Sequence, residues 1–374
     1  RCAAEARAAF LKIKAAGFER AVAKPDSGGG GWGVILNLGS PEAAEAAFRS
    51  IGAQIDEVII KDPRKARGKQ LDQKPPVLFE AQIPDGLMLD VEMVVRDGRK
   101  VFARTRYNPP ALGNQERGTT YPAALTPEME ALAQAQALKS LQAVGLKTGN
   151  AHVEVILTLV GGKLAAPIVE INARMGGADV WASVLESSGL DAMREGLLAA
   201  FGVESHPTPK AAPVLLQHRF LISQAAGTLR AVRGLPTQEG EIFLSEMFFE
   251  PGAEVGEHDL IGNVTVRGTD DISSRNKLFD LLDKIEIEIE TPEGRVVKQT
   301  GLYGHDSRDG RMLAEDWVDR IDFERANWLG RLKLLPRSFH LGYVPSWVLN
   351  AMGQEIQAVA LLLYTASLYG VATS

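Results

Sequence analysis

The sequence predicts an α+β protein built on antiparallel sheets. Short strand-like segments follow one another across tight turns such as Asp97-Gly98 and Gly161-Gly162, a pattern typical of β-hairpins. Helix-like segments rich in Ala, Leu and Glu separate groups of strands, and the regular β–α–β alternation of a parallel sheet is missing. The chain has 374 residues, 45% hydrophobic and 24% charged, which excludes a disordered or collagen-like chain and predicts two or three packed domains.

Charge and cysteine content narrow the class of partner. The net charge of -6 offers no general basic field, so we expect no nucleic-acid partner and no membrane partner. The single cysteine, Cys2, excludes a disulfide framework and a multi-thiolate metal site, and it fits a reducing, cytoplasmic compartment. The apolar run over 357–374 is short for a membrane span, and we expect a packed helix there.

The first 110 residues predict helices and strands around a glycine-rich loop. Ser40 is the expected N-cap of the second helix, with Glu42 in its first turn. The basic segment over 61–76 is expected to be a solvated surface loop. The expected elements are a helix over 5–16, strands over 19–24 and 33–38, a helix over 40–51, and strands over 77–83, 88–95 and 100–108.

The remaining chain predicts a second group of strands and helices after a loop rich in Gly, Asn and Pro. Residues 301–374 show no recognisable chemistry. The expected elements are a helix over 127–144, strands over 152–160 and 164–173, a helix over 180–202, strands over 215–223, 228–232 and 241–249, and a helix over 273–289.

The glycine-rich loop is the first candidate binding element. Gly28, Gly30 and Gly33 formally match the GxGxxG dinucleotide fingerprint, but a strand follows them where that fingerprint opens a helix. A glycine loop between two strands, entered by Lys24, instead suits a flap whose backbone amides close over nucleotide phosphates. A plain flexible hairpin is the alternative.

The segment over 152–174 is the second candidate. If the loop 161–163 joins the strands, Val160 pairs with Leu164, and Glu154 then faces Glu170 across the ladder. Two carboxylates opposite each other destabilise a sheet unless a cation lies between them. A hard divalent cation is the natural occupant, while a solvated polar face and a two-carboxylate glycosidase site remain open.

The same register places further polar groups on this face. His152 faces Asn172, and Arg174 continues the face beyond the strand. The Asn172 amide oxygen would complete the protein share of a magnesium shell, and Arg174 would hold a transferring phosphoryl group or a developing oxyanion. Arg104 and Arg106, on the strand over 100–108, are candidates for holding a substrate carboxylate, with a solvated strand face equally compatible.

Three pieces in this order resemble the ATP-grasp superfamily of carboxylate–amine ligases: the Lys-Pro glycine loop, the EAQI strand over 80–83, and the segment AHVEVILTLVGGKLAAPIVEINARMGG. Within it, the sequence is most similar to the amino-acid ligase branch that includes carnosine synthase, with biotin-carboxylase-like subunits as the relatives to exclude. The resemblance implies an α+β ATP-grasp fold: two α/β subdomains with antiparallel sheets clasping ATP, plus a C-terminal lid-like region. The implied domains are a core over 1–210 without the family's N-terminal domain, a β-rich subdomain over 211–300, and an extension over 301–374.

The resemblance also implies roles for individual residues. Lys24 would contact ATP phosphates, and His152 and Arg174 would be catalytic, Arg174 by stabilising an acyl phosphate. Glu80 would receive the adenine amino group, while the backbone of Ala81 and Ile83 contacts the ring. The flap would consist of Gly28, Gly29, Gly30, Gly31 and Gly33, and the metal ligands would be Glu154, Glu170 and Asn172.

The function implied is an ATP-dependent ligase that forms an amide or dipeptide bond through an acyl phosphate, with ADP and phosphate as products. Its cofactors would be ATP and Mg²⁺, with Mn²⁺ as the alternative ion, and its other partners small-molecule carboxylates and amines. A homo-oligomer is left open. The alternatives are a biotin-carboxylase-like carboxylation and a nucleotide-binding module without turnover.

Overall fold

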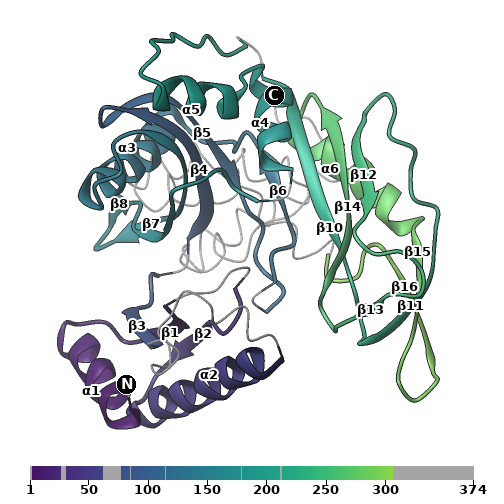
Figure 1. Cartoon of the computed structure of the whole chain (residues 1–374), viewed down its shortest axis with the longest axis horizontal. Coiled ribbons are helices and arrows are strands. Elements are labelled where there is room, and N and C mark those ends of the chain that lie inside the picture. The colour runs from purple at the N-terminus through teal and green to yellow at the C-terminus, as the bar shows by residue number, and fades with distance from the viewer. Residues whose placement is uncertain are drawn as a thin grey trace, which may run out of the picture. The chain divides into compact units, whose positions relative to one another are not determined.

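The computed structural model describes residues 2–26, 31–61, 77–84, 86–113, 115–177, 179–210 and 213–305 (Figure 1). These residues form two compact units. Unit 1 holds the described residues up to Pro84 together with Ala111–Glu116, and unit 2 holds the other described residues. The domain boundaries expected at 210 and 300 remain a prediction.

Unit 1 is a small three-stranded antiparallel sheet with two helices packed on it. The strand order is β2-β1-β3, and the core joins Phe10 of the first helix to Ala21, Ala23 and Ile51. Ser40 Oγ accepts a hydrogen bond from the Ala43 N–H at 3.1 Å, which confirms the expected N-cap. The elements are α1 (Ala3–Ala15), β1 (Ala21–Pro25), β2 (Ile35–Leu38), α2 (Pro41–Lys61) and β3 (Val77–Ala81).

Unit 2 is organised by a nine-stranded sheet in the order β12-β14-β10-β6-β5-β4-β7-β8, with β9 paired to β7. Every pairing in it is antiparallel, as expected. The strands are β4 (Leu87–Arg96), β5 (Arg99–Tyr107), β6 (Gly118–Tyr121), β7 (Gly149–Val160), β8 (Lys163–Ala165), β9 (Ile168–Asn172), β10 (Leu215–Ile222), β12 (Ile242–Met247) and β14 (Leu260–Gly268).

The two faces of this sheet differ because side chains alternate along each strand. On one face Leu89, Val91 and Met93 of β4 are fully buried in a core shared with α3 (Pro127–Ala143), which packs against β5 and β7 (Figure 1). On the other face Val94 and Phe102 pack with residues of α4 (Val180–Ser188) and α5 (Ala192–Ala200). Next to them, the same face carries Asp90 and Glu92 of β4 opposite Glu154 and His152 of β7.

A smaller sheet, in the order β13-β11-β15-β16, completes unit 2. It shares an apolar core with α6 (Asp271–Asp283), which also contacts β10 and β14. Its strands are β11 (Gly227–Arg233), β13 (Glu254–Val255), β15 (Glu286–Glu290) and β16 (Val296–Thr300).

Three expected helices differ in the structure. The helix expected over 40–51 continues to Lys61. The helix expected over 180–202 is two helices, because Gly189 adopts a left-handed C-cap with φ 71° and Asp191 caps the next helix by accepting from the Arg194 N–H. The helix expected over 273–289 ends at Asp283, and Glu286–Glu290 is a strand whose two isoleucines are buried while its glutamates are not.

Among the described residues, no helix is both long and apolar enough to cross a membrane. The apolar run over 357–374 lies outside the described residues.

Candidate active site

The register of β7 and β9 sets the geometry of the site. Glu154 faces Glu170 and His152 faces Asn172, which confirms the expected pairing. The expected loop was wrong, however. Val160 pairs with Lys163, so the turn is only Gly161-Gly162, both at positive φ as a type I′ turn requires.

A bulge restores the pairing that the shorter turn would have shifted. Val155 pairs with Ile168 while Glu154 pairs with Glu170, so Val169 is the extra residue on β9. The bulge puts the two glutamates back opposite each other, on the polar face of the sheet.

Strands β4 and β5 extend this polar face, and the acidic residues of β4 were not among the predicted site residues. Asp90 faces Glu154 and Glu92 faces His152 across the β4–β7 ladder. The available signal was the pair of carboxylates at alternate positions in an otherwise apolar strand, MLDVEMVV. On the next strand Arg106 faces Asp90 and Arg104 faces Glu92.

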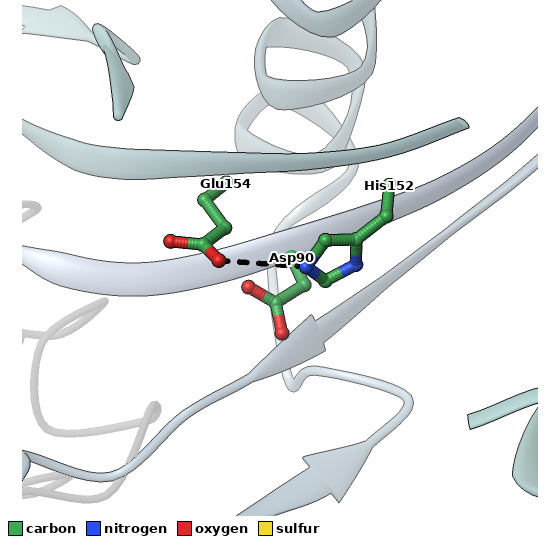
Figure 2. Close-up of side chains that lie close together, drawn as sticks. All are labelled: Asp90, His152 and Glu154. Carbon is green, nitrogen blue, oxygen red and sulfur yellow. Dashed lines mark ion pairs between the residues drawn. The ribbon is translucent and has the colours of Figure 1, made fainter. Parts of the chain in front are cut away.

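The acidic residues of β4 are buried and paired. Arg106 Nη2 lies 2.7 Å from Asp90 Oδ2, and the Asn108 amide donates to the same oxygen at 2.8 Å. Glu92 is fully buried, with its Oε1 at 2.6 Å from His152 Nδ1. His152 Nε2 lies 3.5 Å from Glu154 Oε1, the contact marked in Figure 2. The imidazole therefore lies between two carboxylates.

Burial lowers the pKa of the His152 imidazole, but hydrogen bonds to Glu154 and Glu92 raise it by more, to about 10. The raised pKa favours the imidazolium form of His152, in which both ring nitrogens are donors. This charge offsets part of the negative charge that Glu92 and Glu154 bring to the face.

Of the expected metal ligands, Glu154 belongs to a group of side chains that could hold a hard divalent cation. One ligand atom each from Asp90, His152 and Glu154 lies within 4.8 Å of the others (Figure 2), and the buried Asp90 Oδ1 has no hydrogen-bond partner. Glu170 is exposed, accepts from Asn172 Nδ2 at 3.0 Å, and forms no ion pair within the described part of the chain. Carboxylate oxygens of this kind suit Mg²⁺.

The two expected arginine candidates behave differently. Arg106 is committed to Asp90, and is therefore a structural partner of that carboxylate. Arg104 Nε is buried without a hydrogen-bond partner, and unlike Arg106 this guanidinium forms no ion pair with another described residue. Arg174 is exposed beyond the end of β9, and its Nη1 donates to the Met175 carbonyl at 2.8 Å.

Unit 1 brings two of the expected nucleotide-binding side chains together. Lys24 on β1 and Glu80 on the paired strand β3 form an ion pair with 2.8 Å between Nζ and Oε2. Ala81 ends β3 and Ile83 follows it. Antiparallel β1 and β2 flank the glycine-rich loop, as expected. Gly31 and Gly33 have φ of 72° and 71°, while Gly28, Gly29 and Gly30 lie outside the described residues.

The curated proteins that resemble this chain in sequence are carnosine synthases. No family model matches the chain. Human carnosine synthase 1 is 33% identical over 144 residues, which cover 37% of this chain and 17% of that protein. Chicken carnosine synthase 1 is 28% identical over 280 residues, or 72% of this chain and 28% of that protein. The chain thus spans well under a third of these curated relatives.

Solved structures show the same fold. The L-amino acid ligase from Bacillus licheniformis superposes with a TM-score of 0.58 at 20% identity, over 77% of this chain and 72% of that one. The biotin carboxylase domain of the Hydrogenobacter thermophilus 2-oxoglutarate carboxylase superposes with a TM-score of 0.55 at 16% identity, over 89% and 67% of the two chains. The chain has the ATP-grasp fold that these structures share.

Proposed function

We propose that this chain carries the ATP- and Mg²⁺-dependent centre of a carboxylate–amine ligase, which forms an amide or dipeptide bond through an acyl phosphate. The observation that supports this most is the pair Glu154 and Glu170, placed opposite each other by the bulge at Val169. Facing carboxylates without a cation repel each other, so this arrangement favours a bound divalent ion. The similarity to carnosine synthase and the shared fold with an amino-acid ligase support the reaction class.

In the proposed reaction a substrate carboxylate oxygen attacks the γ-phosphorus of ATP, and the bond to the β–γ bridging oxygen breaks, giving an acyl phosphate and ADP. An amine then attacks the acyl carbon, phosphate leaves, and the amine loses a proton. Glu154, Glu170 and Asn172 would hold Mg²⁺, which would supply charge neutralisation on the phosphates. A Mn²⁺ ion would satisfy the same oxygen ligands.

The residues of the chain then have distinct tasks. Lys24 would hold a phosphate oxygen, with Gly31 and Gly33 as parts of the flap, and Glu80 would bind the adenine amino group beside the backbone of Ala81 and Ile83. Arg174 would stabilise the charge on the acyl phosphate, and protonated His152 would fix the orientation of Glu154. None of these tasks needs a side-chain nucleophile, because positioning and charge supply the catalysis.

Mg²⁺-dependent ADP release tests this proposal. The chain is incubated with ATP and screened against single amino acids, pairs of amino acids, and bicarbonate. Release that needs both a carboxylate and an amine substrate supports the ligase. Release that depends on bicarbonate would assign the chain to carboxylation instead, and ATP binding without release would make it a nucleotide-binding module.

A further inference from the structure

The loop between β9 and α4, residues 173–177, is anchored on Glu92. Glu92 Oε2 accepts a hydrogen bond from the Gly176 N–H at 3.1 Å, while its Oε1 lies 2.6 Å from His152 Nδ1. Arg106 Nε lies 3.7 Å from the same Oε1. One fully buried carboxylate therefore connects β5, β7 and this loop through hydrogen bonds and charge.

The close approach of the loop to this carboxylate requires glycine at position 176. A Cβ built there would lie 2.7 Å from Glu92 Oε1, 2.9 Å from Val180 Cγ2 and 3.1 Å from His152 Nδ1. The next residue, Gly177, has no atom within 4 Å of the same hypothetical position. Neither glycine has a positive φ, so the difference between them is space alone.

These contacts fix the loop at both ends. Asn172 is held in the ladder opposite His152, and Gly176 is held by Glu92. Arg174 lies between the two anchors, and its guanidinium folds back on the Met175 carbonyl. The short span between two fixed points leaves the backbone of Arg174 little freedom.

We propose that Glu92 and Gly176 form a latch that positions Arg174 over the metal-binding carboxylates, which makes Glu92 a positioning residue. The inference rests on the proposed function, because it assigns the latch to the step in which Arg174 meets the phosphoryl group. Displacing a positioned catalytic group by about 1 Å costs up to 100-fold in rate. The latch therefore acts on turnover, while nucleotide binding depends on other residues.

The test compares Gly176→Ala with the matched control Gly177→Ala in the full chain. We expect Gly176→Ala to lower kcat for ADP release about tenfold or more with the KM for ATP within about twofold, and Gly177→Ala to change neither by more than about twofold. In an Arg174→Ala background, Gly176→Ala should change kcat by less than about twofold, because the group being positioned is gone. Equal effects of the two alanines, or an undiminished Gly176→Ala effect without Arg174, would overturn the proposal.

Hydrogen exchange at the backbone amide of residue 176 tests the latch independently of ADP release. We expect slow exchange in the parent chain and in Gly177→Ala, and fast exchange in Gly176→Ala, since the bond to Glu92 is lost. If the parent chain releases no ADP under any condition, the proposed function fails. The latch is then overturned as well if the amide exchanges equally fast in all three proteins.

Discussion

Replacing Arg106 by Met should destabilise unit 2 strongly. The Arg106 and Asp90 side chains are 9% and 2% exposed, and the guanidinium lies 2.7 Å from Asp90 Oδ2. Methionine keeps much of the length of the arginine stem but removes the charge, so Asp90 keeps only the Asn108 amide on that oxygen. Removing one partner of a buried ion pair costs about 3–5 kcal/mol. That is a large fraction of the roughly 5–15 kcal/mol by which a folded domain is stable.

Arg104→Met is the matched control for this change, because Arg104 lies on the same strand and face but forms no ion pair with another described residue. Urea unfolding followed by circular dichroism and tryptophan fluorescence measures both variants. We expect the control to lose less than about 1 kcal/mol. Adding Asp90→Asn to Arg106→Met should recover at least about 1 kcal/mol, since the unpaired charge is gone. An Arg106→Met loss no greater than that of the control would refute the reasoning.

Two further predictions concern His305 and Lys24. Burial and the nearby Arg219 lower the pKa of His305 to about 3, and its Nε2 donates to the Phe220 carbonyl at 2.6 Å. Below about pH 6.5 the unfolded chain therefore binds a proton that the folded chain does not. As the pH decreases from about 6.5 to about 3, the free energy of unfolding decreases by up to about 1.4 kcal/mol per pH unit. His305→Gln, which keeps a donor, should lose about 2 kcal/mol less than the parent chain between pH 7 and pH 5 in urea unfolding; an unchanged difference would contradict the assignment. Lys24→Ala should weaken ATP binding in calorimetry while changing stability by less than about 1 kcal/mol, because its pair with Glu80 is partly exposed. Unaltered ATP affinity would remove Lys24 from the proposed site.

The pairing of Glu154 with Glu170 was predicted correctly from the sequence, although the turn from which it was inferred was wrong. The expected three-residue loop was one residue too long, and the unexpected bulge at Val169 compensated for it. The pairing was inferred from that loop, and nothing in the local sequence distinguishes a longer loop from a shorter loop with a bulge. The predicted register at the two glutamates was therefore correct, whereas the predicted loop length was not.

The missed features have physical reasons as well. The partners of Asp90 and Glu92 lie on neighbouring strands and in loops, so the role of these carboxylates depends on the sheet order and the chain path around it. Strand β6 is four residues long and was expected as loop, because its pairing with β10 connects segments nearly 100 residues apart. The break at Gly189 and the strand in EIEIE were visible locally, as a helix C-cap glycine and as period-two alternation.

The measurement that tests the central claim most directly is ATP binding by calorimetry with and without Mg²⁺, in the parent chain and in Glu170→Gln. The substitution keeps the size of the side chain and removes one of the two facing charges. We expect Mg²⁺ to strengthen ATP binding in the parent chain and to lose most of that effect in Glu170→Gln, with binding in the absence of Mg²⁺ unchanged. An equal Mg²⁺ effect in both proteins would contradict a metal site at the facing glutamates.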